Sequence, residues 1–527
     1  MLNEMQQKAV DSNSKRILAL AGAGSGKTHC MLSRIDRLIS EGVQPNSILA
    51  LTFTNVGANE LKVRFKKNHG DSLMPEFCTF HGFCYSLISK NPAVRGALGY
   101  SAVPNIATPE DEKSIAITVK AMTGTKLSNS VLNLNSDEVS RADKFAYDVY
   151  WKQYHKMLRN RGLITFDIMC YEVCKLFLNA DSRILSYKLL YKYIFVDEFQ
   201  DTDPKQWDFV KTFTDSSIYV CGDPKQALYS FRGADSSIIK SVAEDPEWET
   251  IELSQNYRST SEICEFSNAI HENAWKGSRY NLHIHSDKHG KNVIIHNSFN
   301  EMSEAELKSK LNYTEDISVA ILCRTNMDVD HVKSMLKSAG IPFYSNKQDS
   351  NNAYILRSAI DDKFLVSWIS SLLPTEEYMR YVRLQSVMPD IMKESEFINH
   401  FGDKYGVILH KIMELRKAVI KAANMTREAF ITEINTILKV HITVADIESV
   451  IDPIEIIGKA ASVIEAQTST SGIYVGTIHS VKGAEFDEVH MYGVNGKSFS
   501  VYSGEDNMAC YYVGCTRAKS ILHIWKE

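Results

Sequence analysis

Apolar residues occur in short continuous runs along the first half of the chain, separated by stretches in which they recur at helical spacing. Four such runs are Arg16–Ala21, Ile48–Phe53, Tyr193–Phe199 and Ser217–Asp223. Runs of this length that are rich in Leu, Ile and Val predict parallel strands buried on both faces. Between the first two runs, the apolar residues of 28–42 fall on one face of a helix. The pattern therefore predicts a βαβ unit in an α/β domain.

A second group of apolar runs follows later in the chain. Its members are Val319–Arg324, Tyr474–Ser480, Glu488–Val494 and Ile521–Trp525. Because a long interval separates the first run from the rest, they predict a second α/β domain built from two pieces. Residues 86–163 and 366–465 are mainly helical in pattern, with an amphipathic helix at Ile431–Val440. The polar stretch Ala466–Gly472 is typical of a linker back into the second α/β domain.

A phosphate-binding loop is the first chemical signal. The string AGAGSGKT (Ala21–Thr28) follows a predicted strand and opens a predicted helix, and it fits the P-loop pattern with Ala at the first glycine position. Small residues let backbone N–H groups close around a β-phosphate. Lys27 would reach the β- and γ-phosphates, and the Thr28 hydroxyl would bind Mg²⁺.

Two adjacent carboxylates supply the second signal. The run YIFVDEFQD (Tyr193–Asp201) is an apolar strand that ends in Asp197 and Glu198. Asp197 can hold Mg²⁺ through its hydration shell, and Glu198 can orient or deprotonate an attacking water. Together with the P-loop, they predict hydrolysis of a nucleoside triphosphate on a RecA-like domain.

Composition narrows the class of protein but does not indicate the partner. Of 527 residues, 44% are hydrophobic and 23% charged, which excludes a disordered chain, a collagen-like chain and a small disulfide scaffold. The net charge of −5 shows no overall basic excess, so charge alone does not indicate nucleic-acid binding. The ten cysteines form no CxxC pair, and we interpret Cys170 and Cys174 as core thiols. A polar N-terminus and the lack of an apolar run of about 18 residues predict a cytoplasmic protein without a membrane span.

Further strings, in a fixed order, resemble a known family. They are DEFQDT (Asp197–Thr202), GDPKQALYSFRGA (Gly222–Ala234), NYRST (Asn256–Thr260), TIHSVKGAEF (Thr477–Phe486) and YVGCTRA (Tyr512–Ala518). With the P-loop they resemble the UvrD/Rep/PcrA branch of superfamily one DNA helicases. The resemblance runs from Leu2 to Lys519 and is weak in the two helical intervals.

This resemblance implies an α/β fold with two RecA-like P-loop NTPase domains, each with a parallel sheet and a helical insertion. The implied segments are 1–85 and 164–262 for core domain one, 86–163 for its insertion, 263–365 and 466–527 for core domain two, and 366–465 for its reduced insertion.

The resemblance also implies the residues of an ATP site. Gln6 corresponds to a glutamine that reads adenine, Tyr257 to a tyrosine that stacks on it, and Gln226 to a sensor of the γ-phosphate. Arginine suits a γ-phosphate contact because it stays charged and binds phosphate oxygens bidentately. The implied ATP-binding residues are Gln6, Ala21, Gly22, Ala23, Gly24, Ser25, Gly26, Lys27, Thr28, Tyr257, Arg258, Glu485 and Arg517. The implied catalytic residues are Lys27, Asp197, Glu198, Gln226, Arg258 and Arg517, with Mg²⁺ held by Thr28 and Asp197.

A track for single-stranded DNA is implied in the same way. Phe53 and Phe231 would stack on bases, which is worth about 1–3 kcal/mol per base and tolerates any sequence. Hydroxyl, amide, imidazole and guanidinium groups would contact the strand. The implied DNA contacts are Phe53, Thr54, Asn55, Thr79, His81, Phe231, Arg232, Arg324, Thr477 and His479.

The chain departs from the family pattern at several places. Val56 replaces a lysine, His29 stands where arginine is frequent, and Phe231 stands where tryptophan is usual. None of these positions is a predicted hydrolytic residue. The second helical insertion is shorter than in the better-known helicases, and we expect this to affect processivity rather than translocation.

Two hypotheses for the function follow. The first is an ATP-dependent single-stranded DNA translocase and helicase, moving 3′ to 5′ by resemblance, which binds single strands and junctions of single- and double-stranded DNA. The alternative is a DNA- or nucleotide-sensing ATPase within a larger assembly, such as a Gabija-like defence or mobile-element system, with little unwinding of its own. A protein partner in repair, replication or defence is compatible with both.

Overall fold

The structure is a computed structural model that divides into two compact units. It describes residues 2–70, 74–132, 139–230, 233–297, 299, 302–311, 317–345, 411, 414–415, 417–419, 421–422, 425–467, 472–496, 499–500 and 504–526. The first unit comprises residues 1–300 and 481–527, and the second comprises residues 301–480. The predicted linker Ala466–Gly472 lies partly outside the described residues.

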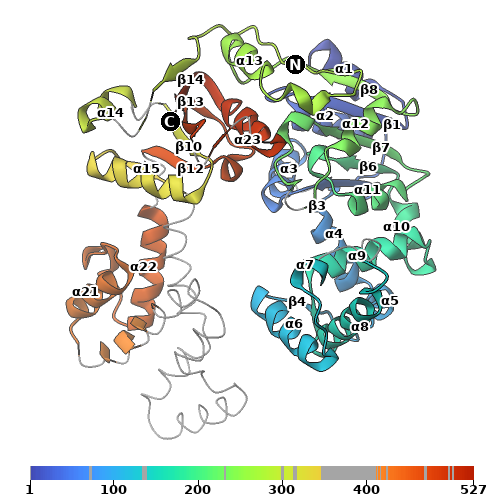
Figure 1. Ribbon diagram of the computed structural model, residues 1–527, viewed down its shortest axis with the longest axis horizontal. Coiled ribbons are helices and arrows are strands. Elements are labelled where there is room, and N and C mark those ends of the chain that lie inside the picture. The colour runs from blue at the N-terminus through green and yellow to red at the C-terminus, as the bar shows by residue number, and fades with distance from the viewer. Residues whose placement is uncertain are drawn as a thin grey trace, which may run out of the picture. The chain divides into compact units, whose positions relative to one another are not determined.

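A six-stranded parallel sheet forms the centre of the first unit (Figure 1). Its order is β3-β2-β6-β7-β1-β8, and neighbouring strands pair in parallel. The strands are β1 (Arg16–Ala21), β2 (Ile48–Thr52), β3 (Glu76–Thr79), β6 (Tyr193–Val196), β7 (Ser217–Gly222) and β8 (Glu249–Leu253). Neighbouring parallel strands need crossover connections, which the intervening helices supply. The four strands predicted from the apolar runs are confirmed.

Helices cover both faces of this sheet because alternate residues of each strand point to opposite sides. Ile17 and Ala19 of β1 pack with α1 (Glu4–Asp11) and α2 (Lys27–Ser40) in one apolar cluster. Leu18 and Leu20 belong to the cluster on the other face. That cluster also includes residues from α4 (Phe80–Lys90), α9 (Phe166–Leu178), α11 (Pro204–Lys211) and α12 (Ser237–Glu244). Further helices of the first unit are α3 (Asn55–His69), α5 (Pro92–Ala97), α10 (Leu185–Leu190) and α13 (Ser261–Asn268).

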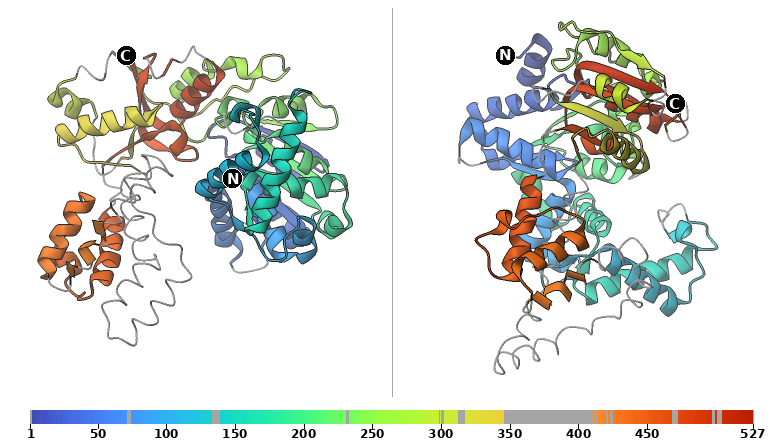
Figure 2. Two further views of the ribbon diagram at one scale, coloured as in Figure 1. Left: turned by 60° about the horizontal axis from the view of Figure 1, so that its bottom comes forward. Right: turned by 90° about the vertical axis from the view of Figure 1, so that its left-hand side faces the viewer.

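The interval 86–163 is mainly helical, as predicted. It contains α6 (Pro109–Thr123), α7 (Asn129–Leu132) and α8 (Lys144–Asn160), which gather away from the parallel sheet (Figure 2). Ile115, Tyr150 and Leu158 are among the buried residues of its own small core. A short parallel pair, β4 (Asn105–Ile106) and β5 (Leu163–Ile164), closes the interval. The predicted boundary at residue 85 falls inside α4.

The strands of the second α/β domain are divided between the two units. In the first unit, β13 (Phe486–Val494) pairs with β14 (Ala518–Lys526), and β14 pairs with β9 (Ile294–His296), all in parallel. Helix α23 (Glu505–Cys515) connects β13 to β14. In the second unit, β12 (Ile473–Thr477) pairs in parallel with β10 (Val319–Cys323) and β11 (Phe343–Tyr344). Helices α14 (Glu304–Lys310) and α15 (Asn326–Ser338) accompany these strands.

The second predicted insertion contains a small helical core of its own. Its described elements include α21 (Arg427–Leu438), the 3-10 helix η9 (Ala445–Ile447) and α22 (Pro453–Gln467). Ile431, Ile434 and Leu438 are buried along one face of α21, which confirms the predicted amphipathic helix. Much of 366–465 lies outside the described residues.

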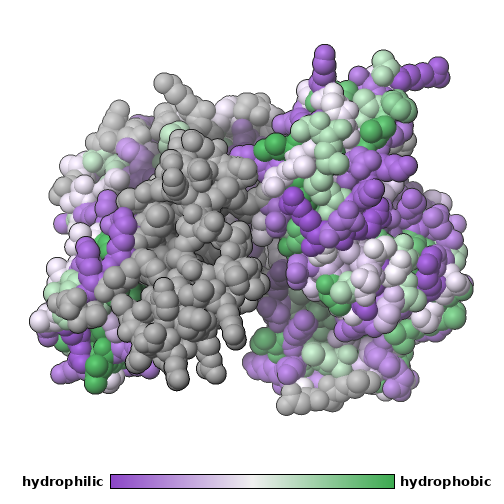
Figure 3. Space-filling model, turned by 90° about the horizontal axis from the view of Figure 1, so that it is seen from below, coloured by the Kyte–Doolittle hydropathy of each residue, from purple (hydrophilic) through white to green (hydrophobic). Residues whose placement is uncertain are grey.

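The burial of Cys170 and Cys174 agrees with their interpretation as core thiols. All ten cysteines are free thiols, Cys174 is buried, and Cys170 packs partly buried against the same core. Hydrophilic residues are widespread on the face shown in Figure 3, and hydrophobic ones are scattered among them. Within the described ranges, no helix has the length and apolar character needed to cross a bilayer.

Candidate active site

The loop between β1 and α2 has the backbone of a phosphate cradle. Gly24 and Gly26 take φ values of 68° and 74°, the left-handed region in which only glycine is unstrained. A Cβ on Gly24 would lie 2.7 Å from the Asn256 side chain, so the close packing of the loop also requires glycine there. Helix α2 begins at Lys27 without a side-chain cap, and the N–H groups of its first turn suit an anion.

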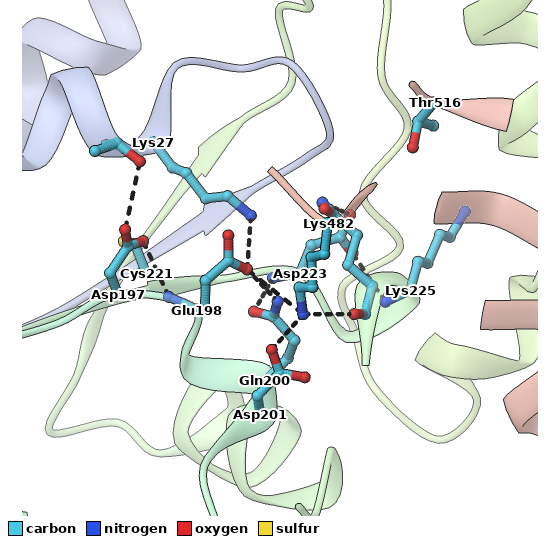
Figure 4. Close-up of polar contacts among 12 residues, drawn as sticks. Lys27, Asp197, Glu198, Gln200, Asp201, Cys221, Asp223, Lys225, Lys482 and Thr516 are labelled. Carbon is cyan, nitrogen blue, oxygen red and sulfur yellow. Dashed lines mark hydrogen bonds and ion pairs between the residues drawn. The ribbon is translucent and has the colours of Figure 1, made fainter. Parts of the chain in front are cut away.

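Three of the predicted catalytic side chains, those of Lys27, Asp197 and Glu198, lie close together beside this loop (Figure 4). The Lys27 ammonium lies 3.2 Å from Glu198 Oε2. The Thr28 hydroxyl donates to Asp197 Oδ2 at 3.4 Å. Hydroxyl and carboxylate oxygens are the ligands that Mg²⁺ prefers, and it binds with few protein ligands and keeps several waters. The residue types therefore fit a Mg²⁺–nucleotide complex, and the assignment of Thr28 and Asp197 as the ion's protein ligands stays a prediction.

Neighbouring charges set the ionisation of this cluster. Burial alone would raise the pKa of Glu198, but the ammonium groups of Lys27 and Lys482 lower it to about 2. Burial and then the charge of Glu198 raise the pKa of Asp197. Burial alone would lower the pKa of Lys27, but Glu198 and Asp197 raise it. At neutral pH, Glu198 is therefore an anion and Lys27 a cation.

Lys482 is a member of this cluster that sequence reasoning missed. Its Nζ forms an ion pair with Asp201 and donates to the Gln226 carbonyl at 3.2 Å. It also lies 3.9 Å from Glu198 Oε2 and 5.0 Å from the centre of the Tyr229 ring. Lys482 stands inside the TIHSVKGAEF string, so the motif was a signal that could have assigned it.

Gln226, the predicted γ-phosphate sensor, lies in a buried hydrogen-bond network. It ends the 3-10 helix η5 (Pro224–Gln226), and its Nε2 donates to Asp223 Oδ2 at 3.1 Å. Asp223 Oδ2 also accepts from the Tyr512 hydroxyl at 3.2 Å. The Gln226 side chain is therefore held by Asp223, which directly follows β7 and is itself bonded to Tyr512 of α23.

Gln6, the predicted adenine reader, contacts the P-loop itself. Its Nε2 donates to the Ser25 carbonyl at 2.9 Å, and its Oε1 accepts the Asn3 backbone N–H at 3.0 Å. The side chain is only 2% exposed. To read adenine, Gln6 has to exchange one of these partners, and its role there stays a prediction.

Tyr257 and Arg258 follow the strand β8 and approach the same loop. The Tyr257 N–H donates to the Gly24 carbonyl at 2.9 Å, and the Tyr257 side chain is 43% exposed, which leaves its ring accessible for stacking. Arg258 Nε lies 2.7 Å from Glu485 Oε2, and its Nη1 donates to the Thr516 carbonyl at 3.1 Å. Burial alone would raise the pKa of Glu485, but Arg258 lowers it.

Arg517 is almost fully buried near Arg258. It donates to the carbonyls of Val513 at 2.9 Å and Ala484 at 3.3 Å, and to the Thr516 hydroxyl at 3.3 Å. Burial, and then the charge of Arg258, lower the pKa of Arg517 to about 9. An anion such as a γ-phosphate would relieve this unfavourable electrostatic environment.

The predicted DNA contacts of the first unit gather around two helix starts. Phe53 stacks on Tyr229 with ring centres 4.6 Å apart. The Thr54 and Thr79 hydroxyls cap α3 and α4, accepting N–H groups at 3.0 and 2.9 Å. The His81 ring packs edge-on against Phe166, with centres 5.4 Å apart. Both threonines therefore have a structural role beside the predicted DNA contact.

The other predicted DNA contacts lie at the first position of α3, in the second unit or outside the described residues. Asn55 is exposed at the first position of α3. In the second unit, Arg324 directly follows β10, and Thr477 is the last residue of β12. Cys323, which precedes Arg324, is the register partner of Thr477. Arg324 and Thr477 therefore lie at the same end of these two strands. His479 follows in the 3-10 helix η10 (Ile478–Val481). Phe231 and Arg232 lie outside the described residues.

The parallel sheet, the glycine loop and the two carboxylates define a P-loop NTPase. The profile of the UvrD/REP helicase N-terminal domain matches residues 2–247, and that of the UvrD-like helicase C-terminal domain matches residues 251–350 and 346–526. The chain therefore belongs to the UvrD/REP helicase family, which confirms the resemblance seen in its motifs and the class of fold.

Among similar proteins is the ATP-dependent DNA helicase PcrA of Staphylococcus aureus strain Mu50. The two are 26% identical over 608 aligned residues, which cover 99% of this chain and 83% of the relative. The ATP-dependent DNA helicase PcrA of Staphylococcus epidermidis strain ATCC 35984 is likewise 26% identical, over 610 residues and with the same shares of the two chains.

Proposed function

We propose that this protein is an ATP-dependent single-stranded DNA translocase and helicase that steps 3′ to 5′. The observation that carries the proposal is the charged cluster of Lys27, Asp197, Glu198 and Lys482 at the foot of the P-loop. Membership of the UvrD/REP helicase family and the names of the PcrA relatives support the same activity.

Nucleotide binding would rearrange the Lys27–Glu198 ion pair. A triphosphate in the loop attracts the Lys27 ammonium, which now lies 3.2 Å from Glu198. Thr28 and Asp197 would hold Mg²⁺, which would supply positive charge to the phosphate groups. Glu198 then keeps Lys482 as its nearest cation and can accept a proton from an attacking water. ATP would thus free the carboxylate that activates water.

Arg258 and Arg517 would stabilise the negative charge that develops on the γ-phosphate. Arg258 is now paired with Glu485, so it has to exchange this carboxylate for phosphate oxygens. Among the described residues, Arg517 donates hydrogen bonds to neutral oxygens. Delivery of these guanidinium groups would couple hydrolysis to a conformational step.

The DNA strand would lie on the side of the sheet marked by Phe53 and the capped helices. Phe53 and its stacking partner Tyr229 present aromatic faces that suit bases of any sequence. The starts of α3 and α4, at Thr54 and Thr79, suit phosphate groups. Arg324, Thr477 and His479 stay predicted DNA contacts of the second unit.

Measurement of ATPase and strand separation tests this proposal. We expect single-stranded DNA to stimulate hydrolysis and 3′-tailed duplexes to be unwound, with Lys27→Ala inactive in both assays. ATPase without unwinding of 3′- or 5′-tailed duplexes would favour the sensing subunit of a larger assembly. Unwinding of 5′-tailed duplexes alone would overturn the polarity.

A further inference from the structure

Gln200 bridges two parts of the proposed ATP site. It lies in the 3-10 helix η4 (Phe199–Asp201), directly after Glu198, and its side chain is fully buried. Its Nε2 donates to Glu198 Oε2 at 2.5 Å, and its Oε1 accepts the backbone N–H of Asp223 at 3.1 Å. Because the Asp223 N–H can only donate, it fixes which end of the amide faces Glu198.

Asp223 extends this bridge to the sensor. Its side chain accepts the Nε2 of Gln226 at 3.1 Å while its backbone N–H holds Gln200. A continuous chain of hydrogen bonds therefore runs from Glu198 through Gln200 and Asp223 to Gln226. Gln200, Asp223 and Gln226 are at most 3% exposed, so water does not compete for the bonds among them.

The backbone around Gln200 is adapted to this contact. A Cβ on Gly222 would lie 2.4 Å from Gln200 Oε1, so only glycine allows the amide to approach this strand end. Glu198 takes a left-handed conformation with φ 52°, which is unusual for a residue other than glycine. Such conformations persist only where the surrounding contacts hold them, and the Gln200 amide supplies one of those contacts.

We propose that Gln200 is a positioning residue that ties the orientation of Glu198 to the position of the sensor Gln226. This inference rests on the proposed function. When Gln226 moves toward a γ-phosphate, Asp223 and Gln200 transmit the displacement to Glu198. Water activation would then depend on whether a γ-phosphate is present.

A double-mutant cycle tests this coupling. The variants are Gln200→Met, Gln226→Ala and their combination, and kcat and KM for ATP are measured with saturating single-stranded DNA. We expect Gln200→Met to lower kcat at least tenfold while KM stays within threefold. We also expect the double variant to lie within threefold of the slower single variant, because both substitutions break one chain. An unchanged kcat in Gln200→Met, or losses that multiply, would overturn the coupling.

Gln206→Met is the matched control. Gln206 is also buried, but its amide caps α11 through Asp203, at 3.4 Å from the backbone N–H. We expect its kcat to stay within threefold of the parent. If Gln200→Met does not fold, as judged by its thermal midpoint, Gln200→Asn replaces it, since one methylene fewer prevents the amide from bridging both partners.

Different outcomes exclude the positioning role of Gln200 and the proposed function. If the parent hydrolyses ATP, Glu198→Gln is inactive and Gln200→Met matches the parent, only the positioning role is lost. If the parent shows no DNA-stimulated ATPase, the proposed function falls and the positioning role falls with it.

Discussion

The Lys482 ammonium forms a buried ion pair with the carboxylate of Asp201, which lies 281 positions earlier in the chain. The Lys482 side chain is 11% exposed and the Asp201 side chain 0%. Burial raises the pKa of Asp201 to about 6, even though Lys482 acts in the opposite direction. Within the first unit, the pair therefore links the segment 481–527 to the segment that follows the C-terminal end of β6.

Replacement of Lys482 by Ala should destabilise the first unit and slow hydrolysis. Removing one partner of a buried pair leaves an uncompensated charge and costs about 3–5 kcal/mol. Asp201→Asn in the Lys482→Ala background should restore part of this loss, because the amide carries no charge. The measurement is the midpoint of urea unfolding, together with DNA-stimulated ATPase.

Lys519→Ala provides the matched control. Lys519 lies 3.7 Å from Glu485 and 3.6 Å from Asp487, but it is 33% exposed. Exposed pairs contribute about 0–1 kcal/mol, so its unfolding midpoint should barely change. Equal losses in the two lysine variants would show that the Lys482–Asp201 pair has no special role.

Phe53→Ala should weaken binding of single-stranded DNA while leaving hydrolysis without DNA nearly unchanged. Loss of one stacking contact costs about 1–3 kcal/mol, roughly a 5- to 150-fold rise in the dissociation constant. The ring also packs on Tyr229, so the thermal midpoint is measured alongside fluorescence anisotropy of labelled oligonucleotide binding. Tyr171→Ala, at an aromatic 45% exposed on α9, is the control and should bind as the parent does. An unchanged affinity in Phe53→Ala would remove Phe53 from the proposed track.

Gln6→Ala distinguishes two roles of one amide. If Gln6 reads adenine, the ratio of kcat/KM for ATP to that for GTP should fall at least tenfold, since the amide can donate to and accept from the adenine edge. If Gln6 serves only its contact with the Ser25 carbonyl, both values should fall together. Asn3→Ala is the control, because it removes the cap of α1 and leaves the Gln6 side chain in place. We expect the ratio to fall in Gln6→Ala alone.

Local patterns carried much of the fold and the ATP site. The four predicted strands of the first domain are buried apolar runs, and continuous apolar runs of this length are recognisable in a sequence. The loop and the pair Asp197–Glu198 are local strings whose chemistry is set by their own residues. By contrast, Lys482 acquires its role from a partner distant in sequence, and composition or spacing does not reveal such a contact.

The sequence alone also did not predict the hydrogen-bond partners of the site residues. Thr54 and Thr79 are predicted as DNA contacts, but their capping roles depend on where α3 and α4 begin. Gln200 follows the predicted catalytic residue Glu198 by two positions. Its hydrogen bond to Asp223 forms only because β6 and β7 are neighbours in the sheet. Motif strings therefore located the site, and the tertiary structure supplied its connections.

A buried network on β13, β14 and β9 lay outside every motif. The Trp525 indole N–H donates to His490 Nδ1 at 3.0 Å, so His490 Nε2 carries its proton toward Glu488 at 2.7 Å. His523 Nε2 lies 3.4 Å from the same carboxylate, and its Nδ1 lies 2.8 Å from His296 Nε2. These donor atoms of Glu488, His490 and His523 are close enough for a metal ion. However, His490 Nδ1 already accepts the indole N–H, so the arrangement favours hydrogen bonding of this histidine over metal binding.

Stability should therefore fall when the pH drops below about 6.5, the usual pKa of an unfolded histidine. Burial, and then the imidazoles of His490 and His296 and the charge of Lys291, lower the pKa of His523 in the folded protein to about 3. A lowered histidine pKa means that the unfolded chain takes up the proton first. The contribution is thus complete above pH 6.5 and is lost by about 1.4 kcal/mol per pH unit toward pH 3. Thermal melts of the parent and of His523→Gln between pH 7.5 and 5 measure it, and the variant should lose less stability over this range. His283→Gln, at an exposed histidine, should follow the parent, and identical slopes for His523→Gln and the parent would assign the acid sensitivity to other groups.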